Sequence, residues 1–105
     1  MERPYFVYLL RCVDNSLYTG ITTDVGRRFE EHSGKPVGAK YTASRTPVRM
    51  ERVWSCDGRS TASKLEYRIK TLSHVQKELL IKDGRQLSVL LGQYIDTTLY
   101  QEETV

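Results

Sequence analysis

The sequence has few cysteines and no long apolar run. Only two cysteines occur among its 105 residues, Cys12 and Cys56, and each lies inside an apolar segment. Their spacing does not suggest a zinc site, and reduced thiols in a cytoplasmic protein are favoured over a disulfide. No apolar stretch approaches the roughly 20 residues of a membrane span. The N-terminal stretch MERPYFVYLLRC is interrupted by Arg11 and lacks a small-residue cleavage site, so it is interpreted as a strand and not as a signal peptide.

Basic residues are absent after Arg85, which makes the charge uneven along the chain. The whole chain has a formal net charge of +3, whereas residues 1–92 hold 16 basic and 10 acidic side chains. The basic residues concentrate between residues 34 and 52, where Glu51 is the single acidic residue: Lys35, Lys40, Arg45, Arg49 and Arg52. Such a stretch suits a polyanion such as nucleic acid, and a solvated basic loop is the alternative.

Internal repeats and low-complexity segments are also lacking. The length suits one domain, which we predict over residues 1–92. The apolar pattern fades from Gln93 onward, so residues 93–105 are predicted to be a flexible C-terminal tail.

The first half of the chain predicts a β-hairpin followed by a helix. PYFVYLLRC and SLYTGI are rich in aromatic and β-branched residues and flank a turn near Asp14 and Asn15. The first strand is apolar at nearly every position, which predicts cover on both of its faces. Thr23 and Asp24 are candidate N-caps for a helix that ends near His32.

The second half predicts a strand and further helices. VRMERVWSC, at 48–56, has an imperfect apolar alternation typical of a half-buried strand with a bulge. An amphipathic helix is predicted after the N-cap candidates Ser60 and Thr61, through residue 72. Ser73 and Gln76 form a capping box for the next helix, which is predicted to close at Gly84, and a last helical turn covers residues 87–91.

Two pairs of residues are candidates for a shared site. Arg28 and His32 are four residues apart on one predicted helix, so both could grip one ligand, although a surface arginine and an ordinary C-terminal histidine are the alternative. Tyr8 and Tyr18 face the same side of the hairpin only if its loop has an odd number of residues. Gly20 indicates either close approach of another group to the strand or a bulge.

Glu66 also has two possible roles. It lies beside the apolar stripe of the predicted helix over residues 60–72, four residues before Lys70. One role is an ion pair with Lys70, and the other is the single carboxylate ligand of a magnesium ion that takes its remaining ligands from water and phosphate.

Taken in chain order, these residues resemble a known family. VYL at 7–9, YTG at 18–20, RRFEEH at 27–32 and Glu66 within ASKLEYRIK resemble the GIY-YIG nuclease superfamily. LYTGITTDV, GAKYT and LEYRIKTLS are similar to its small single-domain bacterial branch, known as UPF0213. The resemblance covers residues 5–85, and its specificity comes from the ordered set, because each triplet alone is a weak signal.

The resemblance implies an α+β fold with a β-β-α-β-α core, in which helices flank a central three-stranded antiparallel sheet. It also implies metal-dependent cleavage of DNA phosphodiester bonds with a single Mg²⁺ or Mn²⁺ ion. Carried over by position, the implied catalytic residues are Tyr8, Tyr18, Arg28, His32 and Glu66, with Glu66 as the metal ligand. The sequence departs from the family pattern at Val7, Leu9 and Thr19, and it has no secure counterpart to the asparagine that some relatives carry after the glutamate.

The resemblance implies a chemical role for each of these side chains. Tyr8 takes the proton from the attacking water, assisted by Tyr18 or His32, and Arg28 with the metal must stabilise its phenolate because a free tyrosine has a pKa of about 10. Arg28 also stabilises the transition state, and the metal on Glu66 stabilises the leaving 3′ oxygen. The residues expected to contact DNA are Gly20, Arg27, Lys35, Lys40, Tyr41 and Arg45.

The small size of the domain bears on its choice of substrate. A core of this size has little surface for reading base edges, which favours nicked, flapped or branched DNA, or help from a protein partner. The alternative functions are a non-catalytic nucleic-acid-binding module on the same fold and a purely structural interaction domain. The sequence indicates no oligomeric state.

Overall fold

The N-terminal hairpin places its two tyrosines on one face of the sheet. In this computed structural model, which describes residues 4–32 and 47–104, β1 (Pro4–Cys12) pairs antiparallel with β2 (Leu17–Thr22). The amide of Cys12 donates to the Ser16 carbonyl at 3.0 Å, and Asn15 turns the three-residue loop with a left-handed φ of 70°. The loop is therefore odd in length, and the predicted condition for a shared face is met. Tyr8 lies opposite Gly20, and Tyr18 lies opposite Leu10.

The sheet has four antiparallel strands in the order β2-β1-β3-β4. β3 (Pro47–Asp57) pairs along the other edge of β1, so β1 is hydrogen-bonded on both sides. Leu9 lies opposite Arg52 and Leu10 opposite Met50, which leaves Glu51 as the extra residue of a bulge. The bulge predicted in this strand is confirmed.

The fourth strand corrects the expectation of a three-stranded sheet. β4 (Gln101–Glu103) lies in the segment predicted to be a flexible tail and pairs with β3. The buried ring of Tyr100 anchors it, and the Tyr100 hydroxyl donates to the Thr61 carbonyl at 2.7 Å. Ser55 Oγ also donates to Glu103 Oε2 at 2.6 Å. These contacts come from distant residues, which explains why a polar three-residue strand leaves no local pattern.

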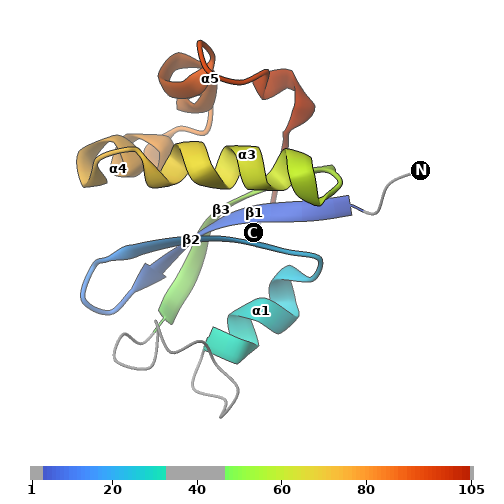
Figure 1. The fold of residues 1–105 in the computed structure, drawn as a ribbon. Helices are drawn as coiled ribbons and strands as arrows, with labels where there is room; N and C mark the ends of the chain where they lie inside the picture. Colours follow the sequence, from blue (N-terminus) through green and yellow to red (C-terminus); the bar gives the residue numbers. More distant parts are fainter. Residues whose placement is uncertain (1–3, 33–46, 105) are drawn as a thin grey trace.

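Helices cover both faces of the sheet (Figure 1). Phe6, Tyr8 and Leu10 of β1 face α1 (Val25–His32) in one small core. Val7 and Leu9 point to the opposite face, into a larger core with α3 (Arg59–Lys70), α4 (His74–Lys82) and α5 (Gln86–Leu91). The prediction that both faces of the first strand are covered is confirmed. A short 3₁₀ helix, η1 (Thr97–Leu99), precedes β4.

The helix ends match the sequence in part. Asp24 Oδ1 accepts from the Arg27 amide at 3.0 Å, as expected of an N-cap, and the Ser73–Gln76 capping box is present. α3 instead begins at Arg59, directly after Gly58 with its φ of 82°, so the predicted caps at Ser60 and Thr61 are wrong. Gly58 is the only residue between the end of β3 and the start of α3, so the helix begins before Ser60 and Thr61.

Two smaller predictions can also be compared with the structure. α4 ends at Lys82, with Asp83 extended, and not at the predicted Gly84. Cys12 and Cys56 are free and buried. Within residues 4–32 and 47–104, no helix is both long enough and apolar enough to cross a membrane.

Candidate active site

Tyr8 lies at the centre of the candidate site, and Gly20 makes room for its ring. The tyrosine side chain is fully buried on the α1 face of the sheet. A Cβ atom at Gly20 would lie 2.5 Å from Tyr8 Oη and 2.7 Å from Cζ, distances that no side chain could keep. The register between β1 and β2 runs without a shift at this position. Of the two interpretations of Gly20, close approach therefore holds and a bulge does not.

Tyr8, Tyr18 and His32 form one aromatic cluster. His32 is the last residue of α1 and is 3% exposed. Its Nε2 atom is 3.1 Å from Tyr8 Oη in a buried hydrogen bond. The Tyr18 and His32 rings meet edge to face with centroids 5.1 Å apart, and the two tyrosine rings lie 6.1 Å apart. The hairpin and α1, separate in the sequence, thus bring three predicted residues into contact.

Burial sets the protonation states in this cluster. It raises the pKa of Tyr8 above its ordinary value of 10.0, and the nearby Tyr18 raises it further. The positive charge of Arg28 opposes this increase but does not outweigh it. Burial and Arg28 both lower the pKa of His32 below its ordinary value of 6.5. At neutral pH the phenol is therefore protonated, and the imidazole is neutral and able to accept a proton at one ring nitrogen.

Arg28 lies beside the cluster on α1 and is held by a neighbour that the sequence analysis gave no role. Its Nε atom is 3.1 Å from Glu31 Oε1, and Glu31 Oε2 is 3.8 Å from Arg27 Nε. The Arg28 contact is an ion pair without hydrogen-bond alignment, and among the described residues no acceptor takes the buried Arg28 Nε–H. The spacing of three residues between Arg28 and Glu31 is the sequence signal that could have identified this partner.

Glu66 lies on α3, in the helical layer on the other face of the sheet from the Tyr8 cluster. Its carboxylate is partly buried, and Oε2 is 3.3 Å from Lys70 Nζ, so the predicted ion pair is present. Its charge contributes a small increase to the pKa of Tyr8, which places it within electrostatic range of the site.

A divalent ion at Glu66 would have to be held by few protein ligands. Within the part of the chain that the structure describes, no group of three or more His, Cys, Asp or Glu side chains could hold a metal. Mg²⁺ commonly binds through one or two carboxylates and keeps several waters beside a substrate phosphate. The partly exposed carboxylate of Glu66 suits an ion held in this way.

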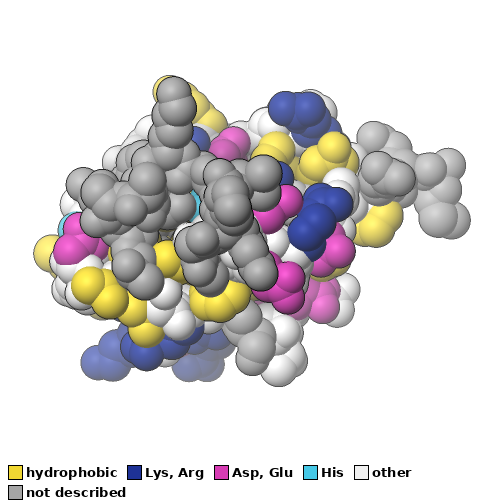
Figure 2. Space-filling model, turned by 90° about the horizontal axis from the view of Figure 1, so that it is seen from below, with side chains coloured by type: hydrophobic (Ala, Val, Ile, Leu, Met, Phe, Trp, Pro, Cys, Tyr) yellow, Lys and Arg dark blue, Asp and Glu magenta, His cyan; other side chains and the backbone are white. Residues whose placement is uncertain are grey.

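The basic side chains expected to contact DNA are only partly visible in the described residues. Lys35, Lys40, Tyr41 and Arg45 lie outside them. Arg27 is largely exposed on α1. Seen from the α1 side, the Lys and Arg side chains of the described residues gather in separate groups near the rim, and acidic side chains lie beside one of these groups (Figure 2).

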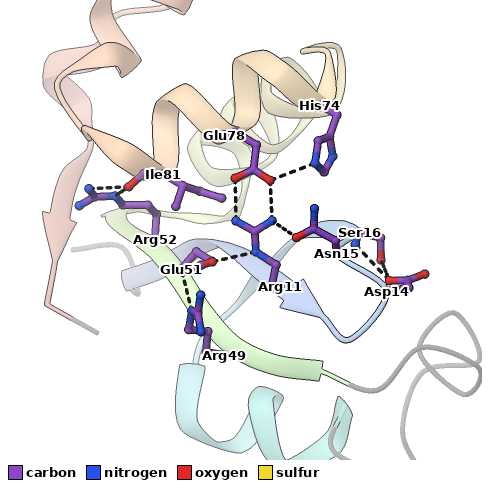
Figure 3. A network of polar contacts seen from close by, with 10 residues as sticks. All are labelled: Arg11, Asp14, Asn15, Ser16, Arg49, Glu51, Arg52, His74, Glu78 and Ile81. Atoms are coloured by element: carbon purple, nitrogen blue, oxygen red, sulfur yellow. Dashed lines mark hydrogen bonds and ion pairs between the residues drawn. The ribbon is translucent and has the colours of Figure 1, made fainter.

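The remaining arginines of the predicted basic stretch have structural partners (Figure 3). Arg49 Nε donates to Glu51 at 3.0 Å. Arg52 donates twice to the Ile81 carbonyl at the end of α4, at 3.0 and 2.7 Å, and also pairs with Glu102. Arg52 is therefore held largely by the fold and contributes less to a free basic surface than the sequence indicated, whereas Arg49 stays mostly exposed beside Glu51.

Comparison with known proteins identifies the family. The GIY-YIG catalytic domain matches residues 4–78, which is more than half of the chain. This chain belongs to the GIY-YIG family. That family is a nuclease superfamily whose members generally use a divalent metal, and DNA is the substrate that such a domain indicates.

The related GIY-YIG proteins come from diverse microbes. The chain is 57% identical over 84 residues to a UPF0213 protein of Vibrio cholerae, covering 77% of this chain and 80% of that protein. It is 50% identical over 82 residues to the UPF0213 protein of Desulfotalea psychrophila, covering 77% and 74%. A solution NMR structure of a UPF0213 protein from Bacillus halodurans is 43% identical, with a TM-score of 0.49 over 75% of this chain and 83% of that chain.

Proposed function

We propose that this protein is a metal-dependent DNA endonuclease that hydrolyses phosphodiester bonds, preferentially in nicked, flapped or branched DNA during cytoplasmic DNA repair or recombination. The observation that carries the proposal is the convergence of Tyr8, Tyr18, His32 and Arg28 on one face of the sheet. A fold-stabilising core alone would not require a buried hydrogen-bonded phenol beside an arginine whose Nε–H has no acceptor among the described residues.

Tyr8 and His32 act together as the general base in this proposal. The pKa of Tyr8 is raised, so its phenol is protonated and can take a proton from the attacking water only by giving up its own. His32 Nε2, 3.1 Å away on a neutral imidazole, receives that proton. This relay replaces the stable phenolate that the sequence hypothesis required, and Tyr18 orients the imidazole through its ring contact.

Arg28 and Glu66 supply the charges for the phosphate. Arg28 stabilises the negative charge that builds on the phosphoryl oxygens, and Glu31 orients its guanidinium. Glu66 is proposed as the metal ligand and a single ion is proposed, because the other carboxylate near the site, Glu31, is paired with Arg28. When bound, Mg²⁺ or Mn²⁺ supplies positive charge that stabilises the leaving 3′ oxygen.

The DNA itself is proposed to lie along the α1 side. Arg27 is exposed beside Arg28 and is suited to a phosphate contact. Lys35, Lys40, Tyr41 and Arg45 complete the proposed DNA contacts, and Gly20 lets Tyr8 sit close to the sheet backbone. A partner protein is one source of further specificity.

Cleavage of labelled duplex, nicked and branched DNA with Mg²⁺ or Mn²⁺ tests this function. Arg28→Ala and Glu66→Gln should each slow cutting by about 100- to 1,000-fold, the range for removing one charge-stabilising group. Arg85→Ala is the control and should cut normally, because Arg85 is exposed and pairs only locally with Asp83. If the wild type binds these DNAs without cutting them, the protein is a nucleic-acid-binding module and the catalytic proposal fails.

A further inference from the structure

A second group of aromatic and basic side chains lies on the helical layer, away from the Tyr8 cluster. Arg68 of α3 lies between two tyrosine rings, with its guanidinium carbon 5.4 Å from the Tyr67 centroid and 4.5 Å from the Tyr94 centroid. Tyr67 and Tyr94 are 62% and 53% exposed. We call these three residues the Tyr-Arg-Tyr stack. Both tyrosines contact the Arg68 guanidinium, and more than half of the surface of each residue remains exposed to solvent.

The charge around the stack favours an anionic partner. α3 carries four basic residues, Arg59, Lys64, Arg68 and Lys70, against the single acidic Glu66. Among the ion pairs within the described residues, only that of Lys70 involves a basic residue of α3. Lys64 lies one helical turn before Arg68 and is exposed. Within α3, Glu66 therefore neutralises one of the four basic charges, and the helix keeps a net positive charge.

We propose that the Tyr-Arg-Tyr stack binds unpaired bases of the DNA substrate, an inference that rests on the proposed nuclease function. Exposed tyrosines and unpaired arginines are the combination that binds single strands, because bases stack on the rings while the cations contact phosphates. Bases in a duplex are already stacked on one another and do not present their faces. The stack therefore selects DNA that contains an unpaired stretch.

The position of the stack on α3 connects it to the cutting site. Tyr67 directly follows Glu66, the proposed metal ligand, and consecutive residues of a helix point about 100° apart around its axis. A DNA strand bound at Glu66 would therefore need to cross only part of the circumference of α3 to reach the Tyr67 ring. In this proposal the unpaired strand extends from the site at Glu66 toward the stack on the helical layer.

Binding measured without divalent metal tests the inference apart from catalysis. Fluorescence anisotropy in EDTA would compare a labelled thymidine oligonucleotide of about 12 nucleotides with a duplex of equal length. The double variant Tyr67→Ala/Tyr94→Ala should weaken single-strand binding at least about 10-fold and leave duplex binding unchanged. Arg68→Gln should reduce the slope of log affinity against log salt by about 0.7 for the single strand.

A matched control removes exposed apolar surface elsewhere. Val89→Ala/Leu99→Ala changes two side chains that are 72% and 56% exposed and should bind both DNAs as the wild type does. The circular dichroism spectrum of each variant should match that of the wild type, and Tyr67→Phe/Tyr94→Phe should keep single-strand affinity because the rings remain. Equal losses for both DNAs, an unchanged single-strand affinity, or no wild-type binding to the single strand would each overturn the inference.

The two proposals fail in different ways. If the wild type cuts DNA and the Tyr67→Ala/Tyr94→Ala variant keeps the same ratio of flap to duplex cleavage, the stack has no role and the nuclease proposal stands. If single-strand binding depends on the rings and no metal supports cutting, the stack holds and the catalytic proposal fails.

Discussion

Gly20 and Tyr8 show how one missing side chain can set the geometry of a site. The Tyr8 ring rests against the backbone of the neighbouring strand at Gly20, and its hydroxyl reaches His32 from that position. Since the hydrogen-bond distance of 3.1 Å leaves little tolerance, displacing the ring would separate Tyr8 from its proton acceptor.

Gly20→Ala should therefore slow cleavage strongly and lower the free energy of unfolding only moderately. The added methyl group would lie 2.5 Å from Tyr8 Oη, so the ring must move, and we expect about 100-fold slower cleavage. Overpacking should also lower the free energy of unfolding by about 1–3 kcal/mol. Cleavage kinetics and urea unfolding would measure the two effects.

Gly26→Ala is the matched control. A Cβ atom at Gly26 would meet only Asp24 Oδ1, at 3.7 Å, and the position is exposed on α1. This variant should cut normally and gain up to about 1 kcal/mol of stability, because alanine favours the helix. Wild-type cleavage by Gly20→Ala would show that the position of the Tyr8 ring is not needed.

At the scale of secondary-structure elements, β4 depends on one aromatic anchor. Tyr100 precedes the strand, is 8% exposed, and donates to the Thr61 carbonyl in α3. Tyr100→Phe should lower the free energy of unfolding by about 1 kcal/mol, because it removes this hydrogen bond and keeps the ring. Tyr94→Phe, at an exposed ring, should leave stability unchanged. Chemical denaturation would measure both, and equal stability of the two variants would contradict the anchoring role.

Local patterns predict most elements but not those that depend on distant partners. The hairpin, the Asp24 cap, the Ser73 capping box and the bulge at Glu51 each follow from neighbouring residues. β4 has no apolar alternation, because its contacts come from β3 and α3. The start of α3 has a different, local cause: Gly58, with its positive φ, takes the N-cap position in place of a residue with a capping side chain.

The same distinction between local patterns and distant partners applies to the candidate site. The spacing of Arg28 and His32 on one helix follows from the sequence, whereas the shared face of Tyr8 and Tyr18 depends on a loop length that the sequence left open. The burial that raises the pKa of Tyr8 depends on how α1 packs on the sheet, which spacing does not encode.

At the scale of the whole molecule, Arg11 links the sheet to the helical layer. From β1 it donates to Glu51 of β3 at 2.8 Å, to Asn15 at 2.8 Å, and to both oxygens of Glu78 in α4 at 2.5 and 2.7 Å (Figure 3). The hydrogen bonds from Arg11 lower the pKa of Glu78 against the effect of burial. Burial raises the pKa of Glu51, but hydrogen bonds from Arg11 and Arg49 outweigh it and leave that pKa lowered.

Arg11→Met should destabilise the protein in a pH-dependent way. Carboxylates whose pKa is lowered by folding add stability above their unfolded pKa of about 4.3 and lose it as the pH falls through the folded pKa. At pH 7 we expect a loss of about 2–3 kcal/mol, below the usual cost of breaking a fully buried pair because Glu78 is partly exposed. Below about pH 4 the difference from the wild type should shrink as both carboxylates become protonated.

Urea unfolding at pH 7 and below about pH 4 would measure the difference in stability between Arg11→Met and the wild type. Arg85→Met is the control, since Arg85 forms an exposed ion pair with Asp83 at one end of the molecule and should leave stability unchanged at either pH. A loss for Arg11→Met that is the same at neutral and acidic pH would show that its packing matters and its charge does not.

The central position of β1 has a consequence for local unfolding. Its backbone is paired with β2 on one side and β3 on the other, and its side chains are buried in both cores. Opening of either layer alone leaves this strand paired and packed on its other side, so we expect its central amides to exchange with solvent mainly through global unfolding. Tyr8 is therefore expected to lie among the slowest-exchanging amides, whereas the amides of the short helix α1, which carries Arg28 and His32, should exchange faster through local opening.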